Sequence, residues 1–305
     1  MTRFLLLAIV ALLVLAVLAV HSFRQDQSTF VLAQTDNKFG QKLYLENCAA
    51  CHGEKGDGKG PQAHRLKTKP RNFTTGNYKF RSTRSGSLPL DEDIFNSIST
   101  GVRTTSMLAQ LHLSEKERWA VSQYLKTFSD RFTSEKPLEP ISIPSKPPFN
   151  AELVALGKTT YAEAGCGTCH GPNGGRGGAS ANDLKDESGN SIVPTDLTNK
   201  PFKSGPNPED LYRTLSTGLN GTPMPSYADA LAPKDRWALV AYILSIATQE
   251  QPRGMMGLIG EEVEGMRVDM RAAMAGMMGG RGMMGRGGGM MDRNMRDMMK
   301  DMTGR

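Results

Sequence analysis

Cysteine is scarce in this chain, and none occurs outside two copies of one five-residue motif. The copies are Cys48-Ala-Ala-Cys51-His52 and Cys166-Gly-Thr-Cys169-His170. A disulfide within a motif is disfavoured, because two cysteines three residues apart would close a small, strained loop. A single zinc site would need its second cysteine pair about 15–20 residues on, whereas these pairs lie in separate halves of the chain. A thioredoxin-type redox pair would need a βαβ pattern, which is missing.

Long apolar runs, clustered charges and strand patterns are also scarce. After residue 20, no stretch is apolar enough to span a bilayer. The formal net charge is +6, but the lysines and arginines are dispersed, so we expect no nucleic-acid partner. Alternating strand-type patterns are nearly absent, while helical periodicity recurs. These features predict an all-α protein.

Residues 1–33 are predicted to be a signal peptide or a membrane anchor. The apolar run from Phe4 to Val20 is short for a membrane-spanning helix and long for a signal peptide. "VLA" at residues 17–19 and at 31–33 could each be a cleavage site. We favour the anchor. Both interpretations place the rest of the chain on the periplasmic side, either tethered to the cytoplasmic membrane or soluble in the periplasm.

The chain contains an internal repeat. "EDIFNSISTG" from Glu92 matches "EDLYRTLSTG" from Glu209, and "ERWAVSQYLKTF" from Glu117 matches "DRWALVAYILSI" from Asp235. The offsets differ by one residue, because the second copy is longer at "KDESGNSIVP" and the first at "KFRSTRSGSLPL". Repetition at a fixed offset predicts two tandem domains of one fold. The predicted domains are residues 36–132 and 150–250, joined by a Pro-rich linker at 133–149.

Three helices are expected in each domain. The first leads to the cysteine motif, the second is "DEDIFNSIST" or "PEDLYRTLST", and the third contains the tryptophan. In the first domain, Ser114 and Glu117 form a capping box at the start of the third helix. Gly101 and Gly218 end the second helix of the first and second domain, respectively. Long Gly- and Pro-rich loops join these small helices. Such loops in a compact domain usually wrap a bound group.

Covalent haem c is the chemistry that best fits the repeated C-x-x-C-H motif. The two thiols add to the haem vinyl groups, and the adjacent histidine becomes an axial ligand of the iron. That histidine would be oriented by a backbone carbonyl acceptor. Pro70 and Pro194 are candidates for this acceptor, with ordinary loop prolines as the alternative.

The distribution of methionine suggests the second axial ligand. Of the 18 methionines, Met1 is the initiator, 15 follow residue 254, and only Met107 and Met224 lie in the body of the chain. These two are 117 residues apart, each just after the second helix of its domain. Core filling is the alternative role, since methionine is a flexible apolar side chain. In the first domain, His64 and His112 are further candidate ligands.

These motifs resemble the class I cytochrome c family, specifically tandem dihaem c-type cytochromes of bacteria. The resemblance covers about residues 36–250 and rests on "CAACHG", "CGTCHG", "TGLNGTPMPSY" and the two closing tryptophan-containing helices. It implies an all-α fold in which the first and last helices of each domain cross. The implied crossing contacts are those of Gly40 and Tyr44 with Tyr124, and of Gly157 and Tyr161 with Tyr242.

The resemblance also implies a set of haem-binding residues. The first domain departs from the family pattern at "TTSML", which lacks a proline after Met107. No residue is expected to be catalytic. The implied iron ligands are His52, Met107, His170 and Met224, and the implied haem-binding residues are these four with Cys48, Cys51, Cys166 and Cys169.

Residues 251–305 form a Met-, Gly- and Arg-rich tail that we expect to be largely disordered. The tail has neither histidine nor cysteine, which disfavours zinc. One interpretation is a flexible docking segment or a segment without a fixed role. The others are Cu(I) binding by thioether sulfur, and an oxidant sink or membrane-surface contact.

The predicted function is an exported electron carrier, not an enzyme. Two protein ligands on each iron leave no position for a substrate, and two covalently bound haem c groups suit one-electron transfer. The expected partners are a donor dehydrogenase or quinol oxidoreductase and a terminal acceptor, and the chain could be an electron-transfer subunit of a larger oxidoreductase. The alternatives are a haem enzyme, such as a peroxidase with a labile ligand at the first haem, and a copper-handling protein.

Overall fold

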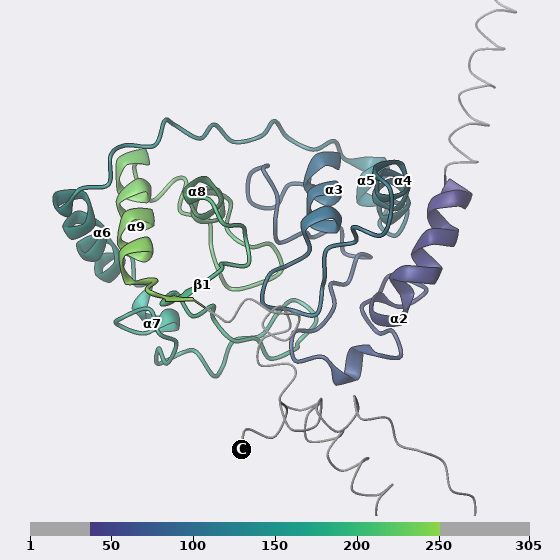
Figure 1. The fold of residues 1–305 in the computed structure, drawn as a ribbon, viewed down its shortest axis with the longest axis horizontal. Helices are drawn as coiled ribbons and strands as arrows, with labels where there is room; N and C mark the ends of the chain where they lie inside the picture. The colour runs from purple at the N-terminus through teal and green to yellow at the C-terminus, as the bar shows by residue number, and fades with distance from the viewer. Residues whose placement is uncertain (1–36, 251–305) are drawn as a thin grey trace, which may run out of the picture. The chain divides into compact units, whose positions relative to one another are not determined.

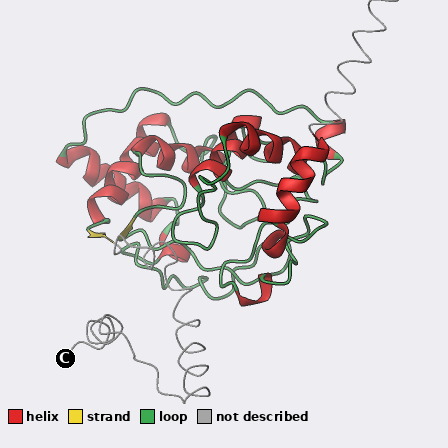
Figure 2. Cartoon of the chain, turned by 45° about the vertical axis from the view of Figure 1, so that its right-hand side comes forward, coloured by secondary structure: helices red, strands yellow, loops and turns green. Residues whose placement is uncertain are grey.

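The computed structural model describes residues 37–250, which form helices joined by long loops (Figures 1 and 2). The predicted signal peptide or anchor and the Met-rich tail, with its suggested Cu(I) binding, lie outside the described residues. Within residues 37–250, no helix is long and apolar enough to cross a membrane. The all-α prediction is confirmed.

Most of the elements fall into two similar series. The first described helix covers residues 37–47. It is followed by α2 Ala49–His52, η1 Ala63–Arg65, α3 Asp91–Thr100, α4 Glu115–Lys126 and α5 Arg131–Ser134. The second series comprises α6 Ala151–Glu163, α7 Gly167–His170, β1 Asn199–Lys200, α8 Pro208–Thr217, α9 Pro233–Ile246 and β2 Gln249–Glu250. In the described region the two short strands pair in parallel.

In each domain the first helix crosses the tryptophan-containing helix, α4 or α9, at a glycine. A Cβ atom on Gly40 would overlap the carbonyl oxygen of Ala120 in α4, and one on Gly157 would overlap that of Ala238 in α9. Glycine therefore allows the two backbones to touch. In Figure 1, α6 and α9 lie side by side, and they pack against each other.

Tyrosines pack next to each crossing. The ring centroids of Tyr44 and Tyr124 are 5.4 Å apart, and those of Tyr161 and Tyr242 are also 5.4 Å apart. The predicted contacts at both crossings are confirmed.

Local sequence signals determine where several helices begin and end. The Ser114 hydroxyl accepts a hydrogen bond from the Glu117 N–H, and the Glu117 carboxylate accepts one from the Ser114 N–H, which confirms the predicted capping box. Pro208 lies in the first turn of α8, where its missing N–H costs nothing. Gly101 and Gly218 end α3 and α8 with φ values of 65° and 64°.

Each domain has its own apolar core. The first is built around Leu43, Tyr44, Ile94, Val121 and Leu125. The second is built around Tyr161, Tyr212, Trp237, Leu239 and Val240.

The Pro-rich linker contacts both domains. The Ile141 N–H donates to the carbonyl oxygen of Ser82 at 2.8 Å, while Ile143 packs against the core of the second domain.

Candidate haem sites

Each C-x-x-C-H motif forms a single helical turn. The His52 N–H donates to the carbonyl oxygen of Cys48 at 2.9 Å, and the His170 N–H donates to that of Cys166 at 3.0 Å. None of the four cysteines forms a disulfide. Burial raises the pKa of Cys48 to about 11 and also raises that of Cys166. Within each turn, two thiols and an imidazole are thus held together and none is consumed by a disulfide.

Both motif histidines are oriented by backbone carbonyls. His52 Nδ1 lies 3.1 Å from the carbonyl oxygen of Arg71, and His170 Nδ1 lies 2.9 Å from that of Thr195. A carbonyl can only accept, so Nδ1 carries the hydrogen and Nε2 keeps its lone pair for a metal. Burial lowers the pKa of both histidines, which favours the neutral, ligating form.

The carbonyl acceptors differ from those expected. The sequence suggested Pro70 and Pro194, but the acceptor in each domain is the following residue, Arg71 or Thr195. In both domains the acceptor lies in the loop that carries the proline, one residue after it, so the alternative of ordinary loop prolines holds. No signal in the residue types could have identified the acceptor, because any residue offers a carbonyl.

A buried tyrosine fixes the end of each motif. The Tyr44 hydroxyl donates to the carbonyl oxygen of Gly53 at 2.6 Å, and the Tyr161 hydroxyl donates to that of Gly171 at 2.7 Å. Each of these glycines directly follows the motif histidine. In each domain, the tyrosine at the helix crossing is therefore also bonded to the end of the histidine turn.

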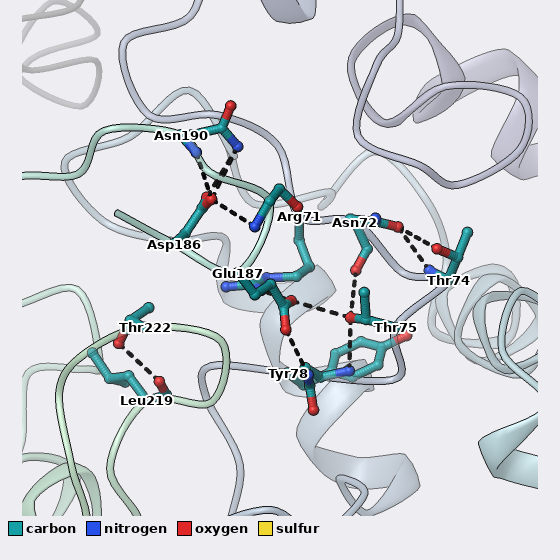
Figure 3. Close-up of polar contacts among 12 residues, drawn as sticks. Arg71, Asn72, Thr74, Thr75, Tyr78, Asp186, Glu187, Asn190, Leu219 and Thr222 are labelled. Atoms are coloured by element: carbon teal, nitrogen blue, oxygen red, sulfur yellow. Dashed lines mark hydrogen bonds and ion pairs between the residues drawn. The ribbon is translucent and has the colours of Figure 1, made fainter. Parts of the chain in front are cut away.

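The two body methionines lie in loops with the same hydrogen-bond pattern. In the first domain, the Met107 N–H donates to the hydroxyl of Thr105, which donates to the carbonyl of Val102. In the second domain the same chain of bonds runs through Thr222 to Leu219, and Figure 3 shows the bond between these two residues.

A further bond closes each methionine loop. The methionine carbonyl accepts from Val102 at 2.8 Å in the first domain and from Leu219 at 3.1 Å in the second. Met107 and Met224 thus occupy structurally equivalent settings.

The other two candidate histidines have different surroundings. His112 Nε2 lies 3.0 Å from the side-chain oxygen of Asn47, on the surface. His64 is exposed in the middle of the short helix η1. Neither repeats in the second domain, where His170 is the single histidine.

The residues at these sites match the donors that haem c requires. Each site offers two thiols and an imidazole with Nε2 unprotonated, and a loop that carries one thioether follows in each domain. In the described part of the chain, no group of three or more His, Cys, Asp or Glu side chains is placed to hold a metal ion by itself. The donor set suits an iron porphyrin better than a bare metal ion.

Comparison with known proteins identifies the family. The family model named Cytochrome c matches residues 38–129 and again residues 154–247. The chain belongs to the cytochrome c family. The family implies covalently bound haem c, and the cysteines at 48/51 and 166/169 fit two haems. This member of the family therefore carries out haem-based electron transfer.

A solved structure is similar to this cytochrome over both domains. It is a chain of the "Kuenenia stuttgartiensis reducing HAO-like protein complex", with 42% sequence identity and a TM-score of 0.68. The match covers 69% of this chain and 96% of that chain. A comparison with curated proteins finds no match.

Proposed function

We propose that this chain is an exported dihaem c-type cytochrome that carries single electrons between redox proteins on the periplasmic side of the cytoplasmic membrane. The apolar run of residues 4–20 supports export. The main support is the matched pair of settings, in which both histidines point Nδ1 at a carbonyl and both methionine loops share one bonding pattern.

The proposed haem-binding residues are thiol pairs, imidazoles and thioethers. When bound, haem iron supplies reversible exchange of one electron between its ferric and ferrous forms. Two protein ligands on each iron would leave no coordination position for a substrate, which favours electron transfer over catalysis. Cys48, Cys51, His52 and Met107 would hold the first haem, and Cys166, Cys169, His170 and Met224 the second.

The chain's own residues hold these ligands in place in advance. The carbonyls of Arg71 and Thr195 fix the ring orientation of the histidines. The hydroxyls of Thr105 and Thr222 fix the backbone of the methionine loops. Ligands held in this way need little rearrangement when the charge on the metal changes, which suits rapid electron exchange.

The solved relative suggests the kind of partner. It is part of a protein complex, and this chain matches nearly the whole of one chain in that complex. We therefore propose that this cytochrome serves as the electron-transfer subunit of a complex with a larger redox protein. Co-purification of the tagged full-length chain, followed by identification of the bound protein, tests this arrangement. An HAO-like protein is expected, and a chain that purifies alone at physiological salt would count against it.

Absorption spectra test the proposed electron carrier directly. The reduced and oxidised holoprotein should give c-type spectra that equimolar CO or peroxide barely changes, because both axial positions are filled. Met107→Leu and Met224→Leu should each open one iron to CO. The double variant should show twice the spectral change on CO binding that either single variant shows. A wild-type protein that binds one equivalent of CO at once would favour an enzyme.

One observation supports a second candidate function, a haem enzyme with a labile ligand at the first site. The Met107 loop contains Thr104 with a φ of 59°, a conformation that β-branched residues rarely adopt. This loop also lacks the proline that follows Met224. Steady-state peroxidase assays of the reduced and half-reduced protein distinguish this candidate from a simple carrier.

A further inference from the structure

The two domains are joined by the segments that break the internal repeat. The extra length of the first copy lies in "KFRSTRSGSLPL", and that of the second lies in "KDESGNSIVP". Arg81 and Ser87 belong to the first segment and Glu187 to the second, and all three form hydrogen bonds with the other domain. Segments absent from one copy are therefore used for contact between the copies.

Glu187 connects the first domain to the loop that carries Met224. Its carboxylate accepts from Arg71 at 2.7 Å and from Asn77 at 2.5 Å. It also accepts from Thr75 at 3.1 Å (Figure 3). Its N–H donates to the carbonyl oxygen of Gly221 at 3.0 Å. One residue thus ties three side chains of the first domain to a position three residues before Met224.

Arg81 binds the end of α8 from the other domain. It is only 2% exposed. One of its terminal nitrogens lies 2.6 Å from the carbonyl oxygen of Thr217, and the other lies 3.4 Å from that of Gly218. A cation at a helix C-terminus stabilises the final carbonyl groups, which lack partners within the helix. The start of the methionine loop is therefore held by a buried charge of the first domain.

Asn220 adds a third contact between the Met224 loop and the first domain. Its side-chain oxygen accepts from the Gly86 N–H at 3.0 Å, and its side-chain nitrogen donates to the carbonyl of Ser87 at 3.3 Å. Contacts at Thr217, Gly218, Asn220 and Gly221 thus cover the segment that leads to Met224.

We propose that the first domain positions Met224. A clamp on residues 217–221, formed by Arg81, by Glu187 and by the hydrogen bonds of Asn220 to the first domain, would hold the thioether of Met224 against the second haem. Arg71 extends this link to the first site, because its carbonyl orients His52 while its guanidinium binds Glu187. The inference rests on the proposed function, since it takes Met224 as an iron ligand.

The test is proton NMR of the ferrous holoprotein, with midpoint potentials from a spectroscopic redox titration. A haem ring current shifts the methyl signal of a bound methionine far from the others, so two such signals are expected. Met107→Leu and Met224→Leu assign them. The variants Glu187→Gln and Arg81→Gln weaken the clamp. Asp91→Asn is the matched control, because it neutralises a carboxylate paired with Lys126 at 2.9 Å within the first domain.

In both clamp variants we expect the Met224 signal to broaden or disappear while the Met107 signal stays unchanged. The potential of the second haem should fall, because loss of a thioether ligand lowers it. A pure charge effect of Glu187→Gln would instead raise the potential. The Asp91→Asn variant should retain both signals. If Arg81→Gln does not fold, Glu187→Gln decides, because its side chain is 19% exposed and tolerates an amide more readily.

An intact Met224 signal in Glu187→Gln would overturn the clamp, as would a raised potential or equal changes in both methionine signals. The proposed function fails in a different way. If Met224→Leu leaves both shifted signals in place, Met224 is not an iron ligand. If Met224→Leu removes one signal and Glu187→Gln leaves it unchanged, only the positioning role is wrong.

Discussion

Thr104 has a backbone φ of 59° at the position where Gly221 has a φ of 74° in the second domain. Both residues precede the body methionine of their domain by three positions. Glycine adopts this conformation without cost, whereas a β-branched residue is strained by about 1–3 kcal/mol. The two methionine loops therefore share their bonding pattern but not their intrinsic stability.

Relief of this strain should stabilise the first domain. We expect Thr104→Asn to raise the free energy of unfolding by about 0.5–1 kcal/mol, because asparagine tolerates a positive φ. Thr104→Gly should give a smaller gain, since glycine adds entropy to the unfolded chain. Urea unfolding of the holoprotein measures both. Destabilisation by Thr104→Asn would show that the Thr104 side chain contributes contacts that outweigh its strain.

The same strain predicts an order of ligand release. In the reduced protein we expect excess CO to bind the first haem before the second, because the Met107 loop is held less firmly. Stopped-flow absorption should show two phases, and Met107→Leu should convert the faster phase into immediate binding. Thr104→Asn should slow that phase without changing the other. A faster phase that Met224→Leu removes instead would reverse the assignment.

The crossing of α6 and α9 should not tolerate a side chain at Gly157. A methyl group on Gly157 would overlap the backbone of Ala238, so Gly157→Ala should destabilise the second domain by about 2–3 kcal/mol despite the better helix propensity of alanine. Thermal unfolding measures the loss. Lys158→Ala is the matched control on the exposed face of the same helix and should change stability little.

Two buried tyrosines should respond differently to the same substitution. Tyr161→Phe removes a 2.7 Å hydrogen bond to Gly171 and should cost about 1–3 kcal/mol, because a buried carbonyl loses its donor. Tyr212→Phe should be neutral or stabilising. Among the described residues, the buried Tyr212 hydroxyl has no hydrogen-bond partner, and the first domain has Phe95 at the equivalent position. Equal losses in the two variants would contradict this interpretation.

The internal repeat made much of the fold predictable. Matched segments predicted the paired helices, and the Gly40–Tyr124 and Gly157–Tyr242 contacts followed from the family resemblance. Equivalent positions of Met107 and Met224 were predicted from the scarcity of methionine in the body of the chain. These features depend on residues that are close in sequence or that recur in both copies of the repeat. A single sequence is therefore enough to predict them.

The interface between the domains could not be predicted in the same way. Arg81 and Glu187 lie in segments present in only one copy, so the repeat contains no counterpart for comparison. The partners of Arg81 in the second domain are backbone carbonyl groups, which no residue type reveals. For the same reason, the sequence misplaced the histidine acceptors by one residue.

Mass spectrometry of the mature protein tests the central claim most directly. The account predicts an intact mass that exceeds the polypeptide by two haem groups. After digestion, one haem should be attached to the peptide containing Cys48–His52 and one to the peptide containing Cys166–His170. Unmodified thiols at either motif, in protein matured by cells that assemble c-type cytochromes, would contradict it.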